Sequence, residues 1–203
     1  GFDLPIFMAT RFNMSFVRHA DRVLSMSQHT RRDLISLLHV DASRITVTYP
    51  GIDRESFCLR DKRKTRQGLN LPQNKRIILH VGVDEPRKNL KTLIEAFYNV
   101  KKNVPRVLLV RIGGMRSATH RLISSLHLED SVIHYERVPN VALFYNAADL
   151  LAFPSYYEGF GLPVLEAMAS GLPVIAGNSS SIPEIVDKAA LLFPPFNVTM
   201  LSD

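Results

Sequence analysis

The sequence predicts an α/β fold in which helices cover both faces of a parallel β-sheet. Two observations carry this prediction. Short apolar runs rich in branched residues, such as RIILHVG and RVLLVRI, are typical of strands that are buried on both faces. Amphipathic stretches alternate with these runs almost throughout, as the helices that connect parallel strands do.

Eight apolar runs have the length and composition of strands. They are Arg22–Met26, Ile45–Tyr49, Arg76–Gly82, Arg106–Ile112, Ser131–Tyr135, Leu150–Phe153, Pro173–Ala176 and Ala190–Phe193. Ser27 or Thr30 is a suitable N-cap for a helix that ends near Leu38. Asn89 is expected to cap a helix over Leu90–Lys101. The other helices are expected at Ala118–Leu126, Asn140–Asn146, Leu162–Ser170 and Ile182–Val186.

Two domains are expected, with a boundary near Gly51–Arg54, because the following interval is the most polar and turn-rich part of the chain. Residues 1–53 supply too few elements for a complete α/β domain, so we expect them to be the end of an N-terminal domain whose earlier part is missing. Residues 54–203 are expected to form a nearly complete parallel-sheet domain. It would stop directly after its last strand with no final covering helix, so the fold reads as truncated at both ends.

The composition excludes several classes of protein. Hydrophobic residues make up 46% of the 203 residues and charged residues 22%, and no apolar run reaches the roughly 18 residues that a membrane-spanning helix needs. The first residues lack the pattern of a secretory signal peptide. Cys58 is the only cysteine, so no intrachain disulfide or cysteine metal cluster can form, and a cytoplasmic location is expected.

The formal net charge of +6 is concentrated in one stretch, which we call the basic cluster. Its members are Arg60, Lys62, Arg63, Lys64 and Arg66. The simpler interpretation is a solvated linker or surface helix, and the alternative is attraction to phosphates or peripheral contact with the anionic cytoplasmic face of a membrane. Nucleic-acid binding is not expected, because no aromatic residues alternate with these cations.

Loops that follow predicted strands carry residues suited to a phosphate, and open parallel sheets bind ligands beyond the carboxyl ends of their strands. In the loop VDEPRKNL, Arg87 and Lys88 are adjacent cations, which suits a diphosphate, although a solvated pair is the simpler alternative. After LLAF, Gly159 and Gly161 allow a tight turn before a helix N-terminus, which favours anions. A third loop, AGNSSSIPE, could line the same crevice, although hydroxyl-rich loops are common caps.

Two carboxylates flank that glycine turn, Glu158 before it and Glu166 one helical turn after it. Both can face the crevice while Leu162, Leu165 and Met168 face the core. Glu166 is placed to accept hydrogen bonds from paired hydroxyls such as those of a ribose, and Glu158 lies nearer to whatever is attached beyond the phosphates. The alternative is that Glu166 only favours its helix N-terminus and that Glu158 is exposed to solvent.

These motifs together resemble a known family. The segments VGVDEPRKNLKTLIEAF, YNAADLLAFPSYYEGFGLPVLEAMASGLPVIA and SSIPEI are similar to those of the family 4 retaining glycosyltransferases of the GT-B fold, which move a sugar from a nucleotide-sugar donor. The segments ADRVLSMSQHTRRDL and ITVTYPGID resemble the end of that family's N-terminal domain and its crossover into the donor domain. The resemblance covers nearly the whole chain and implies the Rossmann-like C-terminal half of a GT-B protein.

The resemblance implies a role for each candidate residue. Glu158 would contact the hydroxyls of the transferred sugar beside the reacting carbon, and Glu166 would hold the ribose. Arg87 and Lys88 would neutralise the leaving diphosphate. Main chain would assist at Gly159, Phe160, Gly161 and Leu162, and at Val138, which would meet the base. No metal or other cofactor would be required, and the sequence has neither an Asp-x-Asp triplet nor a histidine cluster at ligand spacing.

The resemblance also bears on the donor and the acceptor. Val83 stands where many members have Arg, so neutralisation of the phosphates would depend on Arg87 and Lys88. The run Pro-Arg-Lys-Asn is often seen in mannosyltransferase-like members, which favours GDP-mannose and leaves UDP-sugars open. The carbohydrate or lipid-linked acceptor would bind to the family's N-terminal part before Gly1. We therefore expect the isolated chain to bind nucleotide with little or no transfer.

Other functions remain open at this point. A nucleotide-binding oxidoreductase is disfavoured because no G-x-G-x-x-G follows the strand that ends at Gly82. A sugar-nucleotide epimerase or a phosphorylase shares the two-domain architecture, and fold alone does not separate them. A non-catalytic interaction module would bind its partner equally well after changes at Glu158 and Lys88.

Overall fold

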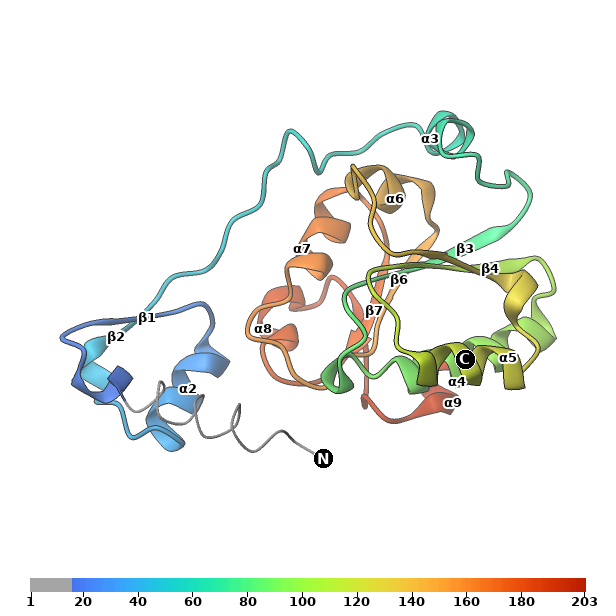
Figure 1. Ribbon diagram of the computed structural model, residues 1–203. Coiled ribbons are helices and arrows are strands. Elements are labelled where there is room, and N and C mark those ends of the chain that lie inside the picture. Colours follow the sequence, from blue (N-terminus) through green and yellow to red (C-terminus); the bar gives the residue numbers. More distant parts are fainter. Residues whose placement is uncertain (1–15) are drawn as a thin grey trace. The chain divides into compact units, whose positions relative to one another are not determined.

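The computed structural model describes residues 16–203, and the chain divides into two compact units, of which the first ends at Gly51 (Figure 1). The first 15 residues of the predicted N-terminal domain lie outside the described residues. The elements of the first unit are the 3-10 turns Phe16–His19 and Ala42–Arg44, the strands β1 (Val23–Ser25) and β2 (Ile45–Val47), and the helix α2 (Gln28–Ser36). The two strands pair in parallel. Ser27 caps α2, because its hydroxyl accepts a hydrogen bond from the N–H of Thr30.

The second unit, residues 52–203, contains a six-stranded sheet in which every pair of neighbours is parallel. Its strands are β3 (Arg76–Val81), β4 (Val107–Ile112), β5 (Val132–Tyr135), β6 (Leu150–Phe153), β7 (Val174–Gly177) and β8 (Leu191–Phe193), and their order in space is β5-β4-β3-β6-β7-β8. The predicted α/β class with a parallel sheet is confirmed.

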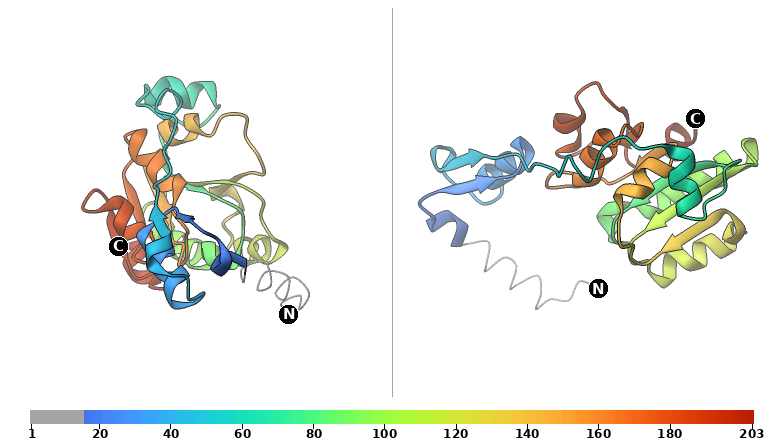
Figure 2. Two further views of the ribbon diagram at one scale, coloured as in Figure 1. Left: turned by 90° about the vertical axis from the view of Figure 1, so that its left-hand side faces the viewer. Right: turned by 90° about the horizontal axis from the view of Figure 1, so that it is seen from above.

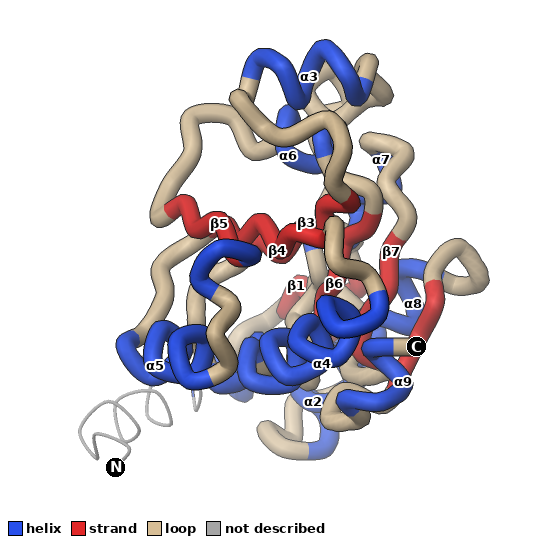
Figure 3. The backbone as a smooth tube through the Cα atoms, turned by 90° about the vertical axis from the view of Figure 1, so that its right-hand side faces the viewer, coloured by secondary structure: helices blue, strands red, loops and turns tan. Residues whose placement is uncertain are grey.

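Alternate residues of the central strands enter two separate cores, one on each face of the sheet. Leu79 and Leu151 pack on the face covered by α6 (Ala142–Ala147), α7 (Leu162–Ala169) and α8 (Ile182–Val186), with α3 (Lys62–Gly68) packed on α6 (Figure 2). Leu109 and Ala152 pack on the other face, under α4 (Leu90–Asn103) and α5 (Ser117–Ser125) (Figure 3). Burial of each such aliphatic side chain contributes roughly 1.5–3 kcal/mol. No helix of residues 16–203 is long and apolar enough to span a membrane.

The sequence suggested that no helix follows the last strand, and this expectation is wrong. The helix α9 (Val198–Ser202) follows β8 and packs against α4. Its N-cap is Asn197, whose side-chain oxygen accepts a hydrogen bond from the N–H of Met200. The element was missed because five residues are too few for a visible helical period.

The basic cluster is not a uniformly solvated segment. Its last four members lie in α3, and the carboxylate of Asp61 caps that helix by accepting a hydrogen bond from the N–H of Lys64. Arg66 is only 5% exposed, and its guanidinium donates to the carbonyl oxygens of Lys75 and Ala147 and to the carboxylate of Asp149. The other four cations of the cluster are exposed. The surface-helix interpretation therefore holds for the exposed members and is wrong for Arg66.

The buried face of α7 also differs from the prediction. Leu162 is 41% exposed, and Leu165 and Met168 are half-buried, whereas Val164 and Ala167 are fully buried against the sheet. Small and medium side chains occupy the buried stripe because they let the helix lie close to the strands. The prediction gave the buried stripe to the largest apolar residues and so rotated the helix by one position, which is about 100°.

Candidate functional site

The strand order places two of the predicted loops next to each other. From β3 the chain continues to β4 and β5 on one side, and it then returns to β6 on the other side of β3. Such a reversal of strand order is where open α/β sheets bind ligands, at the carboxyl ends of the strands. The loop after β3 carries Arg87 and Lys88, and the loop after β6 carries Glu158.

These three side chains meet in one charged cluster. Glu158 Oε2 lies 2.7 Å from Arg87 Nη1, and Glu158 Oε1 lies 2.6 Å from Lys88 Nζ. Glu158 and Lys88 are each only 6% exposed, whereas the side chain of Arg87 is 37% exposed and also contacts Glu85. The alternative in which Glu158 is exposed to solvent is therefore wrong. The arrangement is a buried carboxylate that bridges two cations at the switch point of the sheet.

The backbone brings the cations to this position. Arg87 and Lys88 lie in a 3-10 turn, Pro86–Lys88, and the Arg87 carbonyl oxygen accepts a hydrogen bond from the N–H of Tyr156 in the loop after β6. Lys88 Nζ lies 5.0 Å from the centre of the Phe153 ring, a cation–π contact. Gly82 lies beside the Lys88 stem with φ 145°, a backbone conformation that favours glycine.

Asn89 begins α4 as predicted, but it does not cap the helix with its side chain. Its backbone is left-handed, with φ 54°, and its amide donates to the carbonyl oxygens of Pro154 and Pro195. The hydroxyl of Thr92 donates to the Asn89 side-chain oxygen. Asn89 thus ties the loop that carries the cations to the loops that follow β6 and β8.

The hydroxyl-rich third loop does contact the turn that contains Glu158. The N–H of Glu158 donates to Ser180 Oγ at 2.8 Å. Ser181 Oγ lies 2.9 Å from the Glu158 carbonyl oxygen and 2.6 Å from that of Phe160. Gly161 has φ 118°, and a Cβ there would lie 2.6 Å from Ile182 Cδ1, so a glycine is needed where α7 begins.

Glu166 has a different partner from Glu158. Its Oε2 accepts a hydrogen bond of 2.7 Å from the hydroxyl of Tyr145, which is only 1% exposed. Burial raises the pKa of Glu166 above its ordinary value, although the Tyr145 hydrogen bond opposes this shift. Burial and the charge of Glu166 raise the pKa of Tyr145 well above its usual range, so the phenol keeps its proton and remains a donor.

Beneath the site, three basic side chains lie side by side on neighbouring strands. His80 on β3, Arg111 on β4 and His134 on β5 are in register. Arg111 is only 1% exposed and donates to the carbonyl oxygens of Gly113 and Gly114, and burial lowers its pKa to about 10. Burial also lowers the pKa of His80, so that ring is neutral. Arg111 thereby fixes the loop after β4 at the carboxyl edge.

The structure joins some predicted site residues and leaves others separate. Arg87, Lys88 and Glu158 are in direct contact, and Phe160 shares Ser181 with Glu158. The predicted site residues that are not members of the charged cluster are Val138, Gly159, Phe160, Gly161, Leu162 and Glu166. Val138, in the loop after β5, is half-buried and packs on the core. Within residues 16–203 no group of three metal-ligating side chains is found.

Sequence reasoning missed Tyr145, Ser180 and Ser181. Tyr145 belongs to the quoted run YNAADLLAF, but its partner is not the nearby Asp149: it is Glu166, 21 residues later on another helix. The serines were noted only as residues of a hydroxyl-rich loop. Their contacts depend on β6 and β7 being neighbours, which the sequence alone did not specify.

The comparison with protein families is decisive for the larger unit. Residues 61–203 match the family model described as glycosyl transferases group 1. The chain belongs to this family. Residues 5–56 match a second model, glycosyltransferase family 4, so the two matches together cover most of the sequence.

Curated glycosyltransferases of this kind are similar over most of the chain. It is 35% identical over 164 residues to the D-inositol 3-phosphate glycosyltransferase of Mycolicibacterium paratuberculosis, and 30% identical over 165 residues to D-inositol 3-phosphate glycosyltransferase 2 of Catenulispora acidiphila. The alignments cover 76% and 75% of this chain but 36% and 39% of the relatives. The glycosyltransferase chain therefore spans little more than a third of their length.

Solved structures of glycosyltransferases share the fold. Sucrose-phosphate synthase from Thermosynechococcus elongatus matches with a TM-score of 0.82 and 28% identity, over 97% of this chain and 51% of that one. The C-terminal domain of LpcC from Francisella tularensis matches with a TM-score of 0.66 and 26% identity, over 75% and 85%. Anabaena HepE in complex with UDP-glucose matches with a TM-score of 0.85 over 96% and 56%, and its 24% identity shows the fold alone. The GT-B expectation is confirmed.

Proposed function

We propose that this chain binds the nucleoside-diphosphate sugar of a retaining glycosyltransferase and that the whole protein transfers the sugar to a carbohydrate or lipid-linked acceptor. The observation that carries the proposal is the contact of Arg87 and Lys88 with Glu158 at 2.7 Å and 2.6 Å, at the switch point of the sheet. The family membership of residues 61–203 supports the same reading.

The cations fit the charge that develops in such a transfer. When the bond from the anomeric carbon to the diphosphate breaks, negative charge accumulates on the departing nucleoside diphosphate. Lys88 supplies a compact charge from a site that is almost closed to water, and Arg87 supplies a planar set of donors from the more exposed side. The N-terminus of α7, around Gly159–Leu162, adds a favourable dipole. These groups do not require a metal ion to neutralise the diphosphate, so we propose metal-independent transfer.

Glu158 is proposed to be the catalytic residue. It is the carboxylate that touches both cations, so it would lie where the sugar joins the diphosphate. With retention, the new bond to the acceptor oxygen forms on the face that the diphosphate leaves. Glu166 would hold the ribose, and the main chain near Val138 would meet the base.

Two classes of donor have support, and they differ in the nucleotide base and in the sugar. The sequence run Pro-Arg-Lys-Asn favours GDP-mannose. The relatives described above are D-inositol 3-phosphate glycosyltransferases, and the HepE structure contains UDP-glucose. We therefore place UDP-sugars beside GDP-mannose as donors to test.

Calorimetric titration tests the donor site directly. The 203-residue chain is titrated with UDP, UDP-glucose, GDP and GDP-mannose, with and without Mg²⁺, and the best ligand is repeated on Lys88→Ala. Lys188→Ala is the matched control, because this lysine is exposed in the loop before β8. We expect metal-independent binding that Lys88→Ala weakens by about a hundredfold and the control leaves unchanged. Equal affinity of Lys88→Ala and Lys188→Ala for the nucleotide would contradict the proposal.

The product of the whole protein tests the reaction class. A retaining transferase gives a glycoside with the anomeric configuration of its donor, which proton coupling constants report. An inverted product would contradict retention. Formation of a free epimer, or cleavage that requires inorganic phosphate, would favour the epimerase or phosphorylase alternatives.

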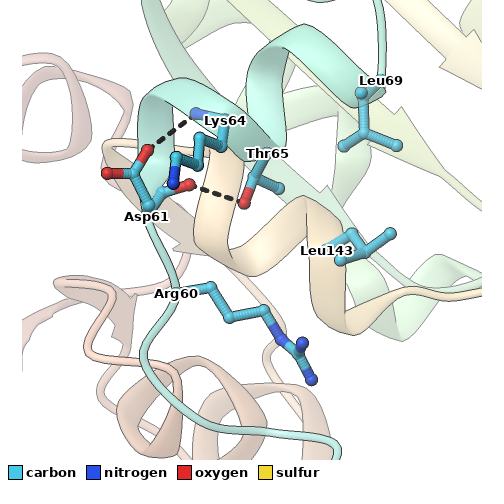
Figure 4. A pocket seen from close by; sticks show the side chains of 7 residues that line it. Arg60, Asp61, Lys64, Thr65, Leu69 and Leu143 are labelled. Carbon is cyan, nitrogen blue, oxygen red and sulfur yellow. Dashed lines mark hydrogen bonds between the residues drawn. The ribbon is translucent and has the colours of Figure 1, made fainter.

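The exposed part of the basic cluster supports a peripheral contact with an anionic membrane surface. Arg60 and Lys64 lie at a hollow of about 390 Å³, into which the apolar side chains of Leu69 and Leu143 face (Figure 4). The hollow is also lined by Asp61, so its charged groups are two cations and one carboxylate. Two cations beside an apolar floor suit a phospholipid headgroup and the start of its chains. We expect sedimentation with phosphatidylglycerol vesicles, no sedimentation with phosphatidylcholine vesicles, and loss of binding in Arg60→Ala/Lys64→Ala. Equal sedimentation of this variant would contradict the contact.

A further inference from the structure

The hydroxyl of Tyr145 has one hydrogen-bond partner among residues 16–203, and that partner is Glu166. The tyrosine is 1% exposed, and a buried phenol needs a partner for its O–H. The adjacent Phe144 shows that α6 also fills the core with a ring that has no hydroxyl. We therefore infer that the hydroxyl of Tyr145 serves the hydrogen bond to Glu166 and that filling the core does not require it.

The segment before α3 also contacts the ring of Tyr145 and its neighbour in α6. Phe57 packs edge-on against it, with ring centroids 6.0 Å apart. The neighbouring Asn146 accepts a hydrogen bond from the N–H of Arg60 and donates to the carbonyl oxygen of Cys58. The segment before α3 thus clamps α6, and the phenol has little freedom to follow a moving carboxylate.

Glu166 in turn depends on this phenol. Within the described part of the chain, Tyr145 is the only residue that donates a hydrogen bond to the Glu166 carboxylate, and it occupies Oε2 at 2.7 Å. Oε1 stays available to accept from a ligand. A carboxylate fixed at one oxygen presents the other in one direction, which lowers the ordering cost of binding paired hydroxyls.

We propose that Tyr145 is a positioning residue for ribose recognition: its hydroxyl fixes Glu166 so that the free oxygen of that carboxylate accepts from the ribose hydroxyls of the donor. This inference rests on the proposed function. It assigns to α6 a role in the nucleotide site although Tyr145 itself touches no ligand. The role is specific to the ribose, so it differs from a general contribution to the stability of the core.

The test compares ribose with deoxyribose. The chain and its Tyr145→Phe variant are titrated with UDP and 2′-deoxy-UDP, and with GDP and 2′-deoxy-GDP, and the base that binds is used. We expect the wild-type chain to prefer the ribonucleotide by about tenfold, the size of a charge-assisted hydrogen bond. Tyr145→Phe is expected to weaken the ribonucleotide by a similar factor and to leave the deoxyribonucleotide within about twofold, so the preference disappears.

Two further variants complete the experiment. Tyr98→Phe removes a hydroxyl from a half-buried tyrosine on α4 and should keep the full preference. Glu166→Asp keeps the negative charge but moves it away from the Tyr145 hydroxyl, so this variant should lose the preference for the ribonucleotide. It replaces Tyr145→Phe in the test if that variant does not fold.

The outcomes separate the two hypotheses. Retention of the preference in Tyr145→Phe, or in Glu166→Asp if the first variant does not fold, overturns this inference and leaves the proposed function standing. Equal weakening of both nucleotides in Tyr145→Phe also overturns it, because a structural defect acts on both. A wild-type chain that binds nucleotides without any preference overturns the ribose role of the pair. Failure of the wild-type chain to bind any of the four nucleotides overturns the proposed function, and the inference with it.

Discussion

The strand β6 has a carboxylate at each end that two cations contact. Before the strand, Asp149 lies 2.9 Å from Lys62 Nζ and 2.7 Å from Arg66 Nη2. After it, Glu158 lies 2.7 Å from Arg87 and 2.6 Å from Lys88. The two clusters therefore share a carboxylate with two near cations, while the exposed Arg76 also lies 4.0 Å from Asp149 and Glu85 also pairs with Arg87. They differ in how the main chain holds their members.

The main chain completes the cluster at Asp149. The N–H of Ile77 donates to its Oδ2 at 2.8 Å, and Arg66 donates to the carbonyl oxygens of Ala147 and Lys75. The carboxylate of Asp149 is therefore fixed to the backbone of β3. The guanidinium of Arg66 is fixed to the backbone at the end of α6 and just before β3. A ligand could not replace Asp149 without breaking these hydrogen bonds.

At Glu158 only side chains contact the carboxylate, although Arg87 Nη1 also donates to the carbonyl oxygen of Tyr157 at 3.4 Å. The two carboxylate oxygens of Glu158 contact Arg87 and Lys88, and no backbone N–H of residues 16–203 donates to them. An incoming anion could take over these cations without breaking any backbone hydrogen bond to the carboxylate. The comparison teaches that backbone participation, more than charge or distance, separates a structural ion cluster from one that can exchange its partner.

The replacement Arg66→Met gives the largest expected effect. It leaves Asp149 without its buried partner and two carbonyl oxygens without a donor. We expect the free energy of unfolding to fall by about 3 kcal/mol, measured by urea denaturation. Nucleotide affinity of the folded variant should be unchanged. A loss below about 1 kcal/mol would show that this cluster is no more structural than a surface pair.

The matched replacement at the other end of β6 is Arg87→Met. Both arginines lie 2.7 Å from their carboxylates, but the Arg87 side chain is 37% exposed, against 6% for Arg66. We expect a stability change below about 1 kcal/mol and a loss of nucleoside-diphosphate affinity of about tenfold, read by the same calorimetry as above. The opposite result, large destabilisation with full affinity, would reverse the comparison.

The sequence predicted the sheet and the loops that carry the charged residues, because both depend on strong local signals. All strands of the parallel sheet were visible as apolar runs, and Arg87, Lys88 and Glu158 lie in the loops that follow two of those runs. The position of a residue after a strand is enough to place it at the carboxyl edge. The family resemblance assigned Glu158 to the sugar and the cations to the diphosphate, but the direct contact of Glu158 with Arg87 and Lys88 was not predicted.

What the sequence could not predict depends on partners far away in the chain. The burial of Arg66 requires Asp149, 83 residues later, and the hydroxyl of Tyr145 requires Glu166 on a different helix. The exposed side of α7 was misjudged for a similar reason, because close packing of Ala167 on the sheet decides the buried face. Such pairings follow from strand order and helix packing, which local patterns do not contain.

The neutral substitution Glu158→Gln sharpens the comparison with a smaller effect. Glutamine keeps the shape of the side chain but frees Arg87 and Lys88 from an ion pair, so a nucleoside diphosphate without sugar should bind about threefold more tightly. The equivalent Asp149→Asn should leave affinity unchanged. Weaker binding by Glu158→Gln would mean that the carboxylate orients the cations for the phosphate and does not compete with it.

The smallest expected effect is a difference in pH dependence between two acids of the unit. Burial raises the pKa of Asp149, but hydrogen bonds from Ile77, Lys62 and Arg66 outweigh it, so its folded pKa lies below its ordinary value of 3.8. Burial raises the folded pKa of Glu166 above 4.5, against the hydrogen bond from Tyr145.

The two shifts act on stability in opposite directions. Asp149 contributes stability that is present above pH 3.8 and is lost as the pH falls through its folded pKa, because the unfolded chain binds its proton first. Glu166 costs stability as the pH rises from 4.5 through its folded pKa, because the folded chain holds that proton longer. We expect Asp149→Asn to flatten the acid limb of the stability curve, measured by urea denaturation from pH 3 to 7, and Glu166→Gln to remove a decline above pH 4.5. Identical slopes of the free energy of unfolding against pH in the two variants would mean that the hydrogen bonds at Asp149 do not favour its charged form. The contrast between the Asp149 cluster and the rest of the unit would then have no electrostatic basis.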